Sequence, residues 1–311
     1  MTPSDGGLEA RLAGWRRNVG DPVALDLASP ADAGRAASAT GFVVVSWNVW
    51  MGRGRLLELV QRLRAGELGE PGDLPPVLLV QEAIRRDDTI PRRSNGFAAR
   101  ELVTRMRPRQ EIVEVARELG WNLRYVPSMR NGAERADRGN AILSPLPLGP
   151  AGAIELPFVL QRRVAVAATA TIGGRSLRLA SVHLDPRGPV GYKWLGAAGR
   201  ALQTAHLLEG LEDPTVVLGA DLNLGRGRAE RTWRLLAEAD FTPGVPPVLP
   251  TWRHTYHSLP RLVIDYILVR NRGGLVRSAR VRRVDEDPSD RGPNVFGSDH
   301  HPLLARIDLR P

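Results

Sequence analysis

Short apolar runs alternate with segments of helical spacing along most of this chain. Apolar residues recur at helical spacing in residues 8–18, 56–63, 111–119, 194–211 and 229–237. In some predicted strands every residue is apolar, and in others apolar and polar residues alternate. The two patterns together are typical of a mixed sheet covered by helices. The pattern therefore indicates an α/β fold. The predicted strands span residues 42–47, 77–80, 141–143, 164–171, 177–182, 216–218, 264–269 and 303–307.

Two segments depart from this alternation. Residues 1–40 end in a stretch rich in Pro, Ala, Gly and Ser, and we interpret them as a partly flexible lead-in to one domain over residues 41–311. Residues 85–109 are charged and weakly periodic, which predicts a long surface insertion. The first 20 residues contain no apolar run, and no stretch approaches the roughly 20 apolar residues of a membrane span. We therefore expect a cytoplasmic monomer without a signal peptide or membrane span.

Composition limits the chemistry. The chain has no cysteine, which excludes disulfides, thiolate metal sites and cysteine nucleophiles. Any metal must then bind to carboxylate, amide or imidazole groups, a set that favours Mg²⁺, with Mn²⁺ as a substitute.

The formal net charge is +9, and clustered cations would attract an anionic partner such as nucleic acid. However, Lys193 is the single lysine among 43 basic residues, and the arginines are spread through every segment. A codon-level bias explains this distribution as well as a nucleic-acid partner does.

Polar side chains with catalytic or metal-binding potential follow the predicted strands at the point where each strand ends. One such residue alone is explained by local hydrogen bonding, because Asn and Asp are favoured in turns. Several together favour a site, since strand ends on one side of an α/β sheet form the usual ligand crevice. The residues are Asn48, Glu82, His183, Asp221 and Asn223.

An aspartate also interrupts the apolar run of residues 262–269. Burying the Asp265 carboxylate costs several kcal/mol unless it is paired, so it needs a partner. The segment Gly297-Ser-Asp-His-His-Pro302 offers Asp299, His300 and His301. We expect one of these histidines to pair with Asp265.

Seven short motifs along residues 42–309 resemble, in order, those of the endonuclease/exonuclease/phosphatase superfamily. Each motif is common by chance, but the ordered set is specific. The resemblance implies a DNase I-like four-layer α/β/β/α sandwich, with two packed mixed sheets flanked by helices, and a metal-dependent phosphoric ester hydrolase. The motifs are Trp47-Asn48, Gln81-Glu82, Gly139-Asn-Ala-Ile-Leu-Ser144, Ser181-Val-His-Leu184, Gly219-Ala-Asp-Leu-Asn223, Ile264-Asp-Tyr-Ile-Leu268 and Gly297-Ser-Asp-His300.

The resemblance also implies a metal site. Glu82 would be the principal magnesium ligand, with Asn48 beside it and Asp299 completing the shell. A second ion near Asp221 and Asn223 stays open, because the sequence cannot count ions.

The remaining site residues acquire catalytic roles by the same resemblance. His300 would act as the acid or base on the phosphate side, oriented by Asp265, and Asp221 is the alternative general base. Asn223 and His183 would donate hydrogen bonds to phosphoryl oxygens.

Substrate contacts are predicted from weaker signals. Two Gly-Arg-Gly-Arg runs contain Arg53 and Arg226, which would either clamp phosphates or lie in solvated turns. Tyr192 and Lys193 follow His183 and would suit contact with a base or a lipid headgroup.

Three other histidines have weaker signals. His301 should point away from His300 on an extended segment, so we interpret it as structural or as part of the cleft rim. His254 and His257 fall in a loop and could line the pocket.

Substrate identity does not follow from the motifs, because the superfamily hydrolyses DNA, RNA, inositol phosphates and sphingomyelin on one scaffold. The basic charge favours a phosphodiesterase that acts on nucleic acid, either as an endonuclease or as an exonuclease. The alternative is an enzyme for a small or lipid phosphate. A non-catalytic nucleic-acid-binding domain is disfavoured by the complete set of polar residues.

Overall fold

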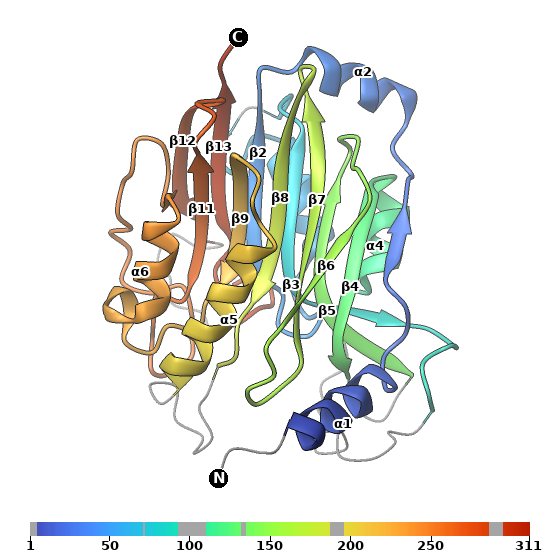
Figure 1. Ribbon diagram of the computed structural model, residues 1–311. Helices are drawn as coiled ribbons and strands as arrows, with labels where there is room; N and C mark the ends of the chain where they lie inside the picture. Colours follow the sequence, from blue (N-terminus) through green and yellow to red (C-terminus); the bar gives the residue numbers. More distant parts are fainter. Residues whose placement is uncertain (1–4, 71, 93–109, 132–134, 187–195, 286–294) are drawn as a thin grey trace.

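The computed structural model describes residues 5–70, 72–92, 110–131, 135–186, 196–285 and 295–311. Two β-sheets are stacked face to face (Figure 1). In the seven-stranded sheet the only parallel neighbours are β2 and β3, among the described residues. Its strands, in spatial order, are β1 (Val23–Leu25), β4 (Asn122–Arg130), β5 (Ala136–Ser144), β3 (Pro76–Arg86), β2 (Gly41–Asn48), β13 (Leu303–Leu309) and β12 (Val276–Arg283).

The second sheet has six strands and is also mixed. Strands β8 and β9 are parallel, and the other neighbouring pairs within the described chain are antiparallel. The order is β10 (Phe241–Thr242), β11 (Asp265–Asn271), β9 (Thr215–Asp221), β8 (Arg175–His183), β7 (Arg163–Ile172) and β6 (Gly152–Leu156).

Side chains along the central strands point alternately to the two faces of each sheet, and both faces are covered. In β2, Phe42 and Val44 pack in the core between the sheets, whereas Val43 and Val45 pack in a second core on the outer face. This is the two-residue period of a strand whose two faces are both covered. A third core lies on the outer face of the six-stranded sheet, where β8 contributes Val182.

Helices cover both outer faces, as Figure 1 shows. Leu59 of α3 and Val115 of α4 belong to the core outside the seven-stranded sheet, and Leu207 of α5 and Leu236 of α6 belong to the core outside the six-stranded sheet. The predicted four-layer α/β/β/α sandwich is therefore confirmed. The helices are α1 (Asp5–Arg16), α2 (Pro30–Ser38), α3 (Leu56–Arg64), α4 (Ile112–Leu119), α5 (Ala197–Glu209) and α6 (Arg231–Glu238), with a 3-10 turn η3 (Gly227–Ala229) before α6.

All eight predicted strands are present, and each predicted helix overlaps an observed one. The pattern missed strands β1, β4, β6, β10 and β12 and helix α2, and arginine, proline or glycine interrupts the alternation in β4, β6 and β12. Strand β12 lies at the edge of the seven-stranded sheet, and only Val276 and Ala279 among its side chains are buried.

The predicted surface insertion at residues 85–109 is wrong at its start. Strand β3 continues to Arg86, and Arg85 is 3% exposed. Arg85 Nε donates to Asp137 Oδ1 at 3.2 Å, and the Tyr125 hydroxyl donates to the same oxygen at 2.7 Å. Because the carboxylate neutralises the guanidinium, a charged residue can occupy an interior strand position. Residues 93–109 lie outside the described residues.

The N-terminal segment contacts the sandwich. Strand β1 pairs with β4 at the edge of the seven-stranded sheet, and α2 begins with a capping box between Ser29 and Asp32. The boundary at residue 40 stays a prediction. Within the described chain, every helix is too short or too polar to cross a membrane.

Candidate active site

The strand ends that carry the predicted polar residues lie together at one end of the two stacked sheets. Strands β8 and β9 are parallel, and His183 lies opposite Asp221 in their register. Strand β11 runs antiparallel to β9 and begins at the end of the sheet where β9 stops, so Asp265 lies opposite Asp221. Asn48 ends β2 in the other sheet, and its Nδ2 donates to Asp221 Oδ2 at 2.9 Å. Strand pairing therefore brings together residues that are far apart in sequence.

These side chains surround a cleft of about 280 Å³. Seven of the eight predicted catalytic and metal-binding residues line it, and the eighth, Asp265, lies behind His300. The described lining consists of Asn48, Trp50, Met51, Glu82, Arg138, Leu160, Gln161, Arg163, His183, Pro186, Asp221, Asn223, Tyr256, Asp299 and His300.

Asp221 lies at the centre of the hydrogen-bond network. Its carboxylate is 1% exposed and accepts from Asn48. The His183 Nε2 atom lies 3.3 Å from Oδ2, and the backbone N–H of Asn223 donates to Oδ1 at 3.1 Å. A buried carboxylate requires such donors to offset the loss of hydration. The network holds Asp221 in one orientation at the floor of the cleft.

Asp265 and His300 form the pair that the sequence predicts. The two Asp265 oxygens lie 3.0 Å and 2.9 Å from His300 Nδ1. The opposite ring nitrogen, Nε2, lies 4.0 Å from Asp221 Oδ2 and 3.9 Å from Asp299 Oδ1. Burial lowers the pKa of His300, but the nearby carboxylates, Asp265 above all, outweigh it and raise the pKa to about 10. His300 is therefore an imidazolium at neutral pH in the metal-free protein.

Glu82 and Asp299 supply further carboxylate oxygens. Glu82 Oε2 accepts from the backbone N–H of Met51 at 3.1 Å, and Oε1 lies 3.8 Å from His183 Nδ1. Burial raises the pKa of Asp299, and the negative charge of Glu82 raises it further although His300 opposes this. A divalent cation would offset the negative charge that raises the pKa of Asp299, and carboxylate oxygens are ligands that such a cation prefers.

Left-handed backbone conformations gather at this site. Among the described non-glycine residues, six have positive φ, and four of them line the cleft: Trp50 (45°), Met51 (53°), Glu82 (54°) and Asn223 (51°). Glu82 lies at a register shift between Val80 and Ala83 in the pairing of β3 with β5. Such conformations persist where the surrounding contacts hold them, and they cluster at functional sites.

Comparison with known proteins identifies the family. The sequence model described as "Endonuclease/Exonuclease/phosphatase family" matches residues 45–300, which is most of the chain. The chain belongs to this family. It is therefore a phosphoesterase, and the family depends on divalent metal. Comparison with curated proteins finds no match.

Solved structures confirm the fold of this family member. The human Nocturnin catalytic domain is 16% identical, with a TM-score of 0.56 over 93% of this chain and 98% of that chain. A Leptotrichia buccalis family protein is 13% identical, with a TM-score of 0.56 over 86% and 99%. D. rerio TDP2 is 16% identical, with a TM-score of 0.54 over 87% and 100%. At these identities the similarity supports the fold alone.

The predicted substrate-binding residues lie elsewhere or outside the described chain. The Arg53 guanidinium lies 4.6 Å from the ring centroid of Trp50, and Arg226 is exposed. Neither belongs to the described lining of the cleft. Tyr192 and Lys193 lie outside the described residues.

Two arginines that sequence reasoning did not select line the cleft instead. Arg163, at the start of β7, contacts Asp185 through Nε at 3.1 Å and donates from Nη2 to Gln161 at 2.8 Å. Arg138 lies in β5, directly before the motif at residues 139–144. In a chain with arginine in every segment, this adjacency was the single available signal for Arg138.

Proposed function

We propose that this phosphoesterase hydrolyses phosphodiester bonds in nucleic acid and uses Mg²⁺. The observation that supports the chemistry is the convergence of three carboxylates, two amides and two imidazoles on one cleft. Hydrolysis of a phosphate ester requires an activated water, neutralisation of phosphoryl charge and stabilisation of the leaving oxygen. The cleft has a candidate group for each requirement.

Glu82, Asn48 and Asp299 would hold the magnesium ion. Their oxygen atoms match its preference for hard ligands, and a cation would offset the negative charge of Glu82 that, together with burial, raises the pKa of Asp299. Bound Mg²⁺ would polarise the phosphoryl group and neutralise charge that develops during hydrolysis.

The residues around Asp221 would carry the proton transfer. Asp221 is held by donors on both oxygens and is our candidate for the base that accepts a proton from the attacking water. His300 Nε2 faces the carboxylates of Asp221 and Asp299, and these negative charges favour a proton on this nitrogen. His300 would therefore donate a hydrogen bond to a phosphoryl oxygen.

The remaining groups would orient the reacting atoms. Asp265 fixes the His300 ring through Nδ1 and acts as a positioning residue. His183 and Asn223, beside Asp221 in the cleft, would donate hydrogen bonds to the phosphoryl oxygens.

A polynucleotide substrate is supported by cations and aromatic rings in the cleft. Arg138 and Arg163 offer guanidinium groups for phosphate, and Trp50 and Tyr256 offer ring faces for a base. The related D. rerio TDP2 structure is described as complexed with single strand DNA product. The alternative substrate, a small phosphate ester, is favoured by the limited volume of the cleft, about 280 Å³.

An activity panel tests this proposal. Purified protein with Mg²⁺ is assayed on plasmid DNA, single-stranded DNA, RNA, a model phosphodiester and inositol phosphates, each with and without excess chelator. We expect nucleic-acid cleavage that needs Mg²⁺ or Mn²⁺ and that Glu82→Gln abolishes or makes strongly dependent on metal concentration. Activity confined to inositol phosphates or the model ester would replace the nucleic-acid assignment, and full turnover in chelator would refute the metal assignment.

A further inference from the structure

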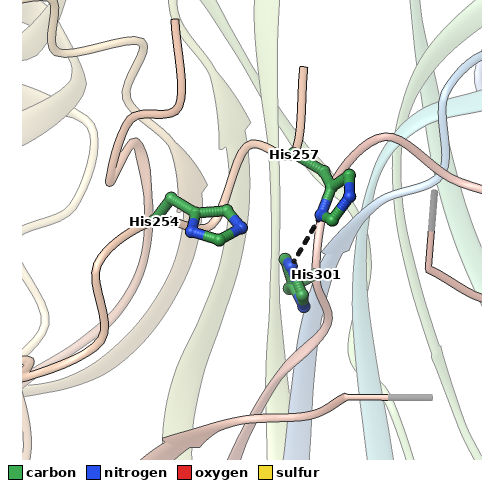
Figure 2. A group of neighbouring side chains, drawn as sticks. All are labelled: His254, His257 and His301. Atoms are coloured by element: carbon green, nitrogen blue, oxygen red, sulfur yellow. Dashed lines mark hydrogen bonds between the residues drawn. The ribbon is translucent and has the colours of Figure 1, made fainter. Parts of the chain in front are cut away.

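A second group of metal-ligating side chains lies outside the active-site cleft. His254, His257 and His301 are 4%, 6% and 0% exposed, and each offers a ring nitrogen within 4.8 Å of the others. Figure 2 shows the three rings turned toward one another. We refer to these residues as the three-histidine cluster. None of them belongs to the described lining of the cleft.

One nitrogen–nitrogen distance within the cluster matches that of a metal site. His257 Nδ1 lies 3.4 Å from His301 Nε2. Two nitrogens bound at 2.0–2.1 Å to one tetrahedral zinc ion lie about 3.3 Å apart, so this pair already has the required separation. The His254 ring centroid lies 5.2 Å from that of His301 and 5.5 Å from that of His257. The ligand nitrogen of His254 lies within 4.8 Å of those of His257 and His301.

The surroundings of His301 match those of a metal-bound histidine. Its Nδ1 lies 2.9 Å from Asp285 Oδ1, which also contacts Arg283, and 3.4 Å from the carbonyl oxygen of Val284, which leaves Nε2 directed toward the other two rings. Metal-ligating histidines generally donate their second N–H to a carboxylate or carbonyl, which fixes the tautomer and ring orientation. Asp285 would therefore be the carboxylate that orients a ligand.

The backbone around the cluster is held by hydrogen bonds. The N–H of His257 donates to the carbonyl of Asp299 at 2.7 Å, and the N–H of His301 donates to the carbonyl of Thr255 at 2.8 Å. These bonds join the loop that carries His254 and His257 to the segment before β13. The ligands thus come from two chain segments that are joined by backbone hydrogen bonds.

We propose that His254, His257 and His301 bind one zinc ion, with a fourth position for water. An all-imidazole set suits zinc and other transition metals, whereas magnesium prefers oxygen ligands. The ion would hold the loop in place and would not act on the substrate, because the three-histidine cluster lies outside the described lining of the cleft. It would fix the loop that carries Tyr256, whose ring lies 5.0 Å from that of His300 and lines the cleft. The zinc proposal does not rest on the proposed nuclease activity.

Zinc binding to the untagged, metal-stripped protein tests this proposal. Zn²⁺ is titrated against a chromophoric chelator in excess Mg²⁺, which occupies oxygen sites without competing for imidazoles. We expect one zinc ion per chain and a rise in the unfolding temperature on binding. Co²⁺ in place of zinc should give the visible absorption of a tetrahedral site.

Variants locate the bound ion. His254→Gln and His257→Gln should each weaken zinc binding by about 100-fold or more, and Asp285→Asn by about 10–100-fold. His206→Gln is the matched control, because His206 is exposed on α5. Glu82→Gln should leave zinc affinity unchanged, which separates this site from the cleft.

Two outcomes would overturn the proposal. Absence of zinc binding and of a tetrahedral Co²⁺ spectrum in the wild-type protein would show that the cluster is polar packing, whether or not the variants fold. Wild-type zinc affinity in folded His254→Gln and His257→Gln would place the ion elsewhere.

Discussion

His300 and His301 are adjacent in the chain but lie in opposite environments. His300 faces the cleft, where Asp265 contacts its Nδ1 and two further carboxylates lie near its Nε2. His301 is fully buried on the other side, among two imidazoles and one carboxylate. Successive side chains of an extended segment point to opposite faces, which separates the two rings.

The comparison shows that partners decide what an imidazole can do. The carboxylates around His300 favour a proton on the ring and a hard cation nearby. The nitrogen atoms around His301 favour a borderline transition metal. One residue step along the chain thus separates the proposed hydrogen-bond donor to phosphate from the proposed zinc ligand.

The largest expected effect is on kcat, which should fall when His300 is replaced but not when His301 is replaced. His300→Ala should lower kcat by about 10²- to 10⁴-fold, the usual contribution of a positioned acid or base. His301→Gln should change kcat by less than about threefold in protein that is folded. The measurement is kcat at saturating Mg²⁺ on the best substrate of the panel, with circular dichroism as the folding control. Equal losses in both variants would break the comparison.

A double-mutant cycle sharpens the assignment of His300 and Asp265. Asp265→Asn should lower kcat substantially, because the amide no longer holds the imidazole as the carboxylate does. Adding His300→Ala should then lower it little further, since residues that act as a unit are non-additive. The cycle is measured on kcat. If the two losses multiply, the residues act independently.

The pH dependence of stability provides a third comparison. The pKa of His300 is raised from 6.5 to about 10, so its stabilising contribution is fully present below pH 6.5 and is lost as pH rises through about 10. The lost free energy of unfolding is at most about 5 kcal/mol. Denaturant unfolding in chelator from pH 6 to 10 measures it.

His300→Gln is the control for this titration. Its unfolding free energy should depend less on pH over the same range, whereas His301→Gln should keep the wild-type slope. Parallel pH profiles for wild type and His300→Gln would contradict the protonated state assigned to His300.

The smallest expected effect concerns arginines inside and outside the cleft. Arg138→Gln should raise KM for a polynucleotide several-fold and reduce the salt dependence of binding by about one counterion, because it removes a phosphate contact. Arg226 lies outside the described lining, so Arg226→Gln should change neither KM nor the salt dependence of binding. Affinity is measured between low and physiological salt. A larger effect at Arg226 would restore the assignment made from the Gly-Arg-Gly-Arg run.

The central strands and the polar strand ends were predictable because each depends on local pattern. Apolar runs such as that in β9 are unambiguous, and Asp221 follows directly in sequence. Strand β12 and residue Arg85 were not predictable. Arginines interrupt the apolar pattern of β12, and a distant partner, Asp137, compensates for the buried charge of Arg85.

The sequence by itself determined the donor types. Without cysteine, the chain has carboxylate, amide and imidazole groups, and it places several of them at strand ends and an aspartate inside an apolar strand that requires a partner. Tertiary structure alone decided which groups meet. It brought His254 and His257 to His301, and Arg138 and Arg163 to the cleft. These contacts join segments that are distant in the chain. Strand register and the path of the loops determine how far apart the side chains lie, and neither has a local signal in the sequence.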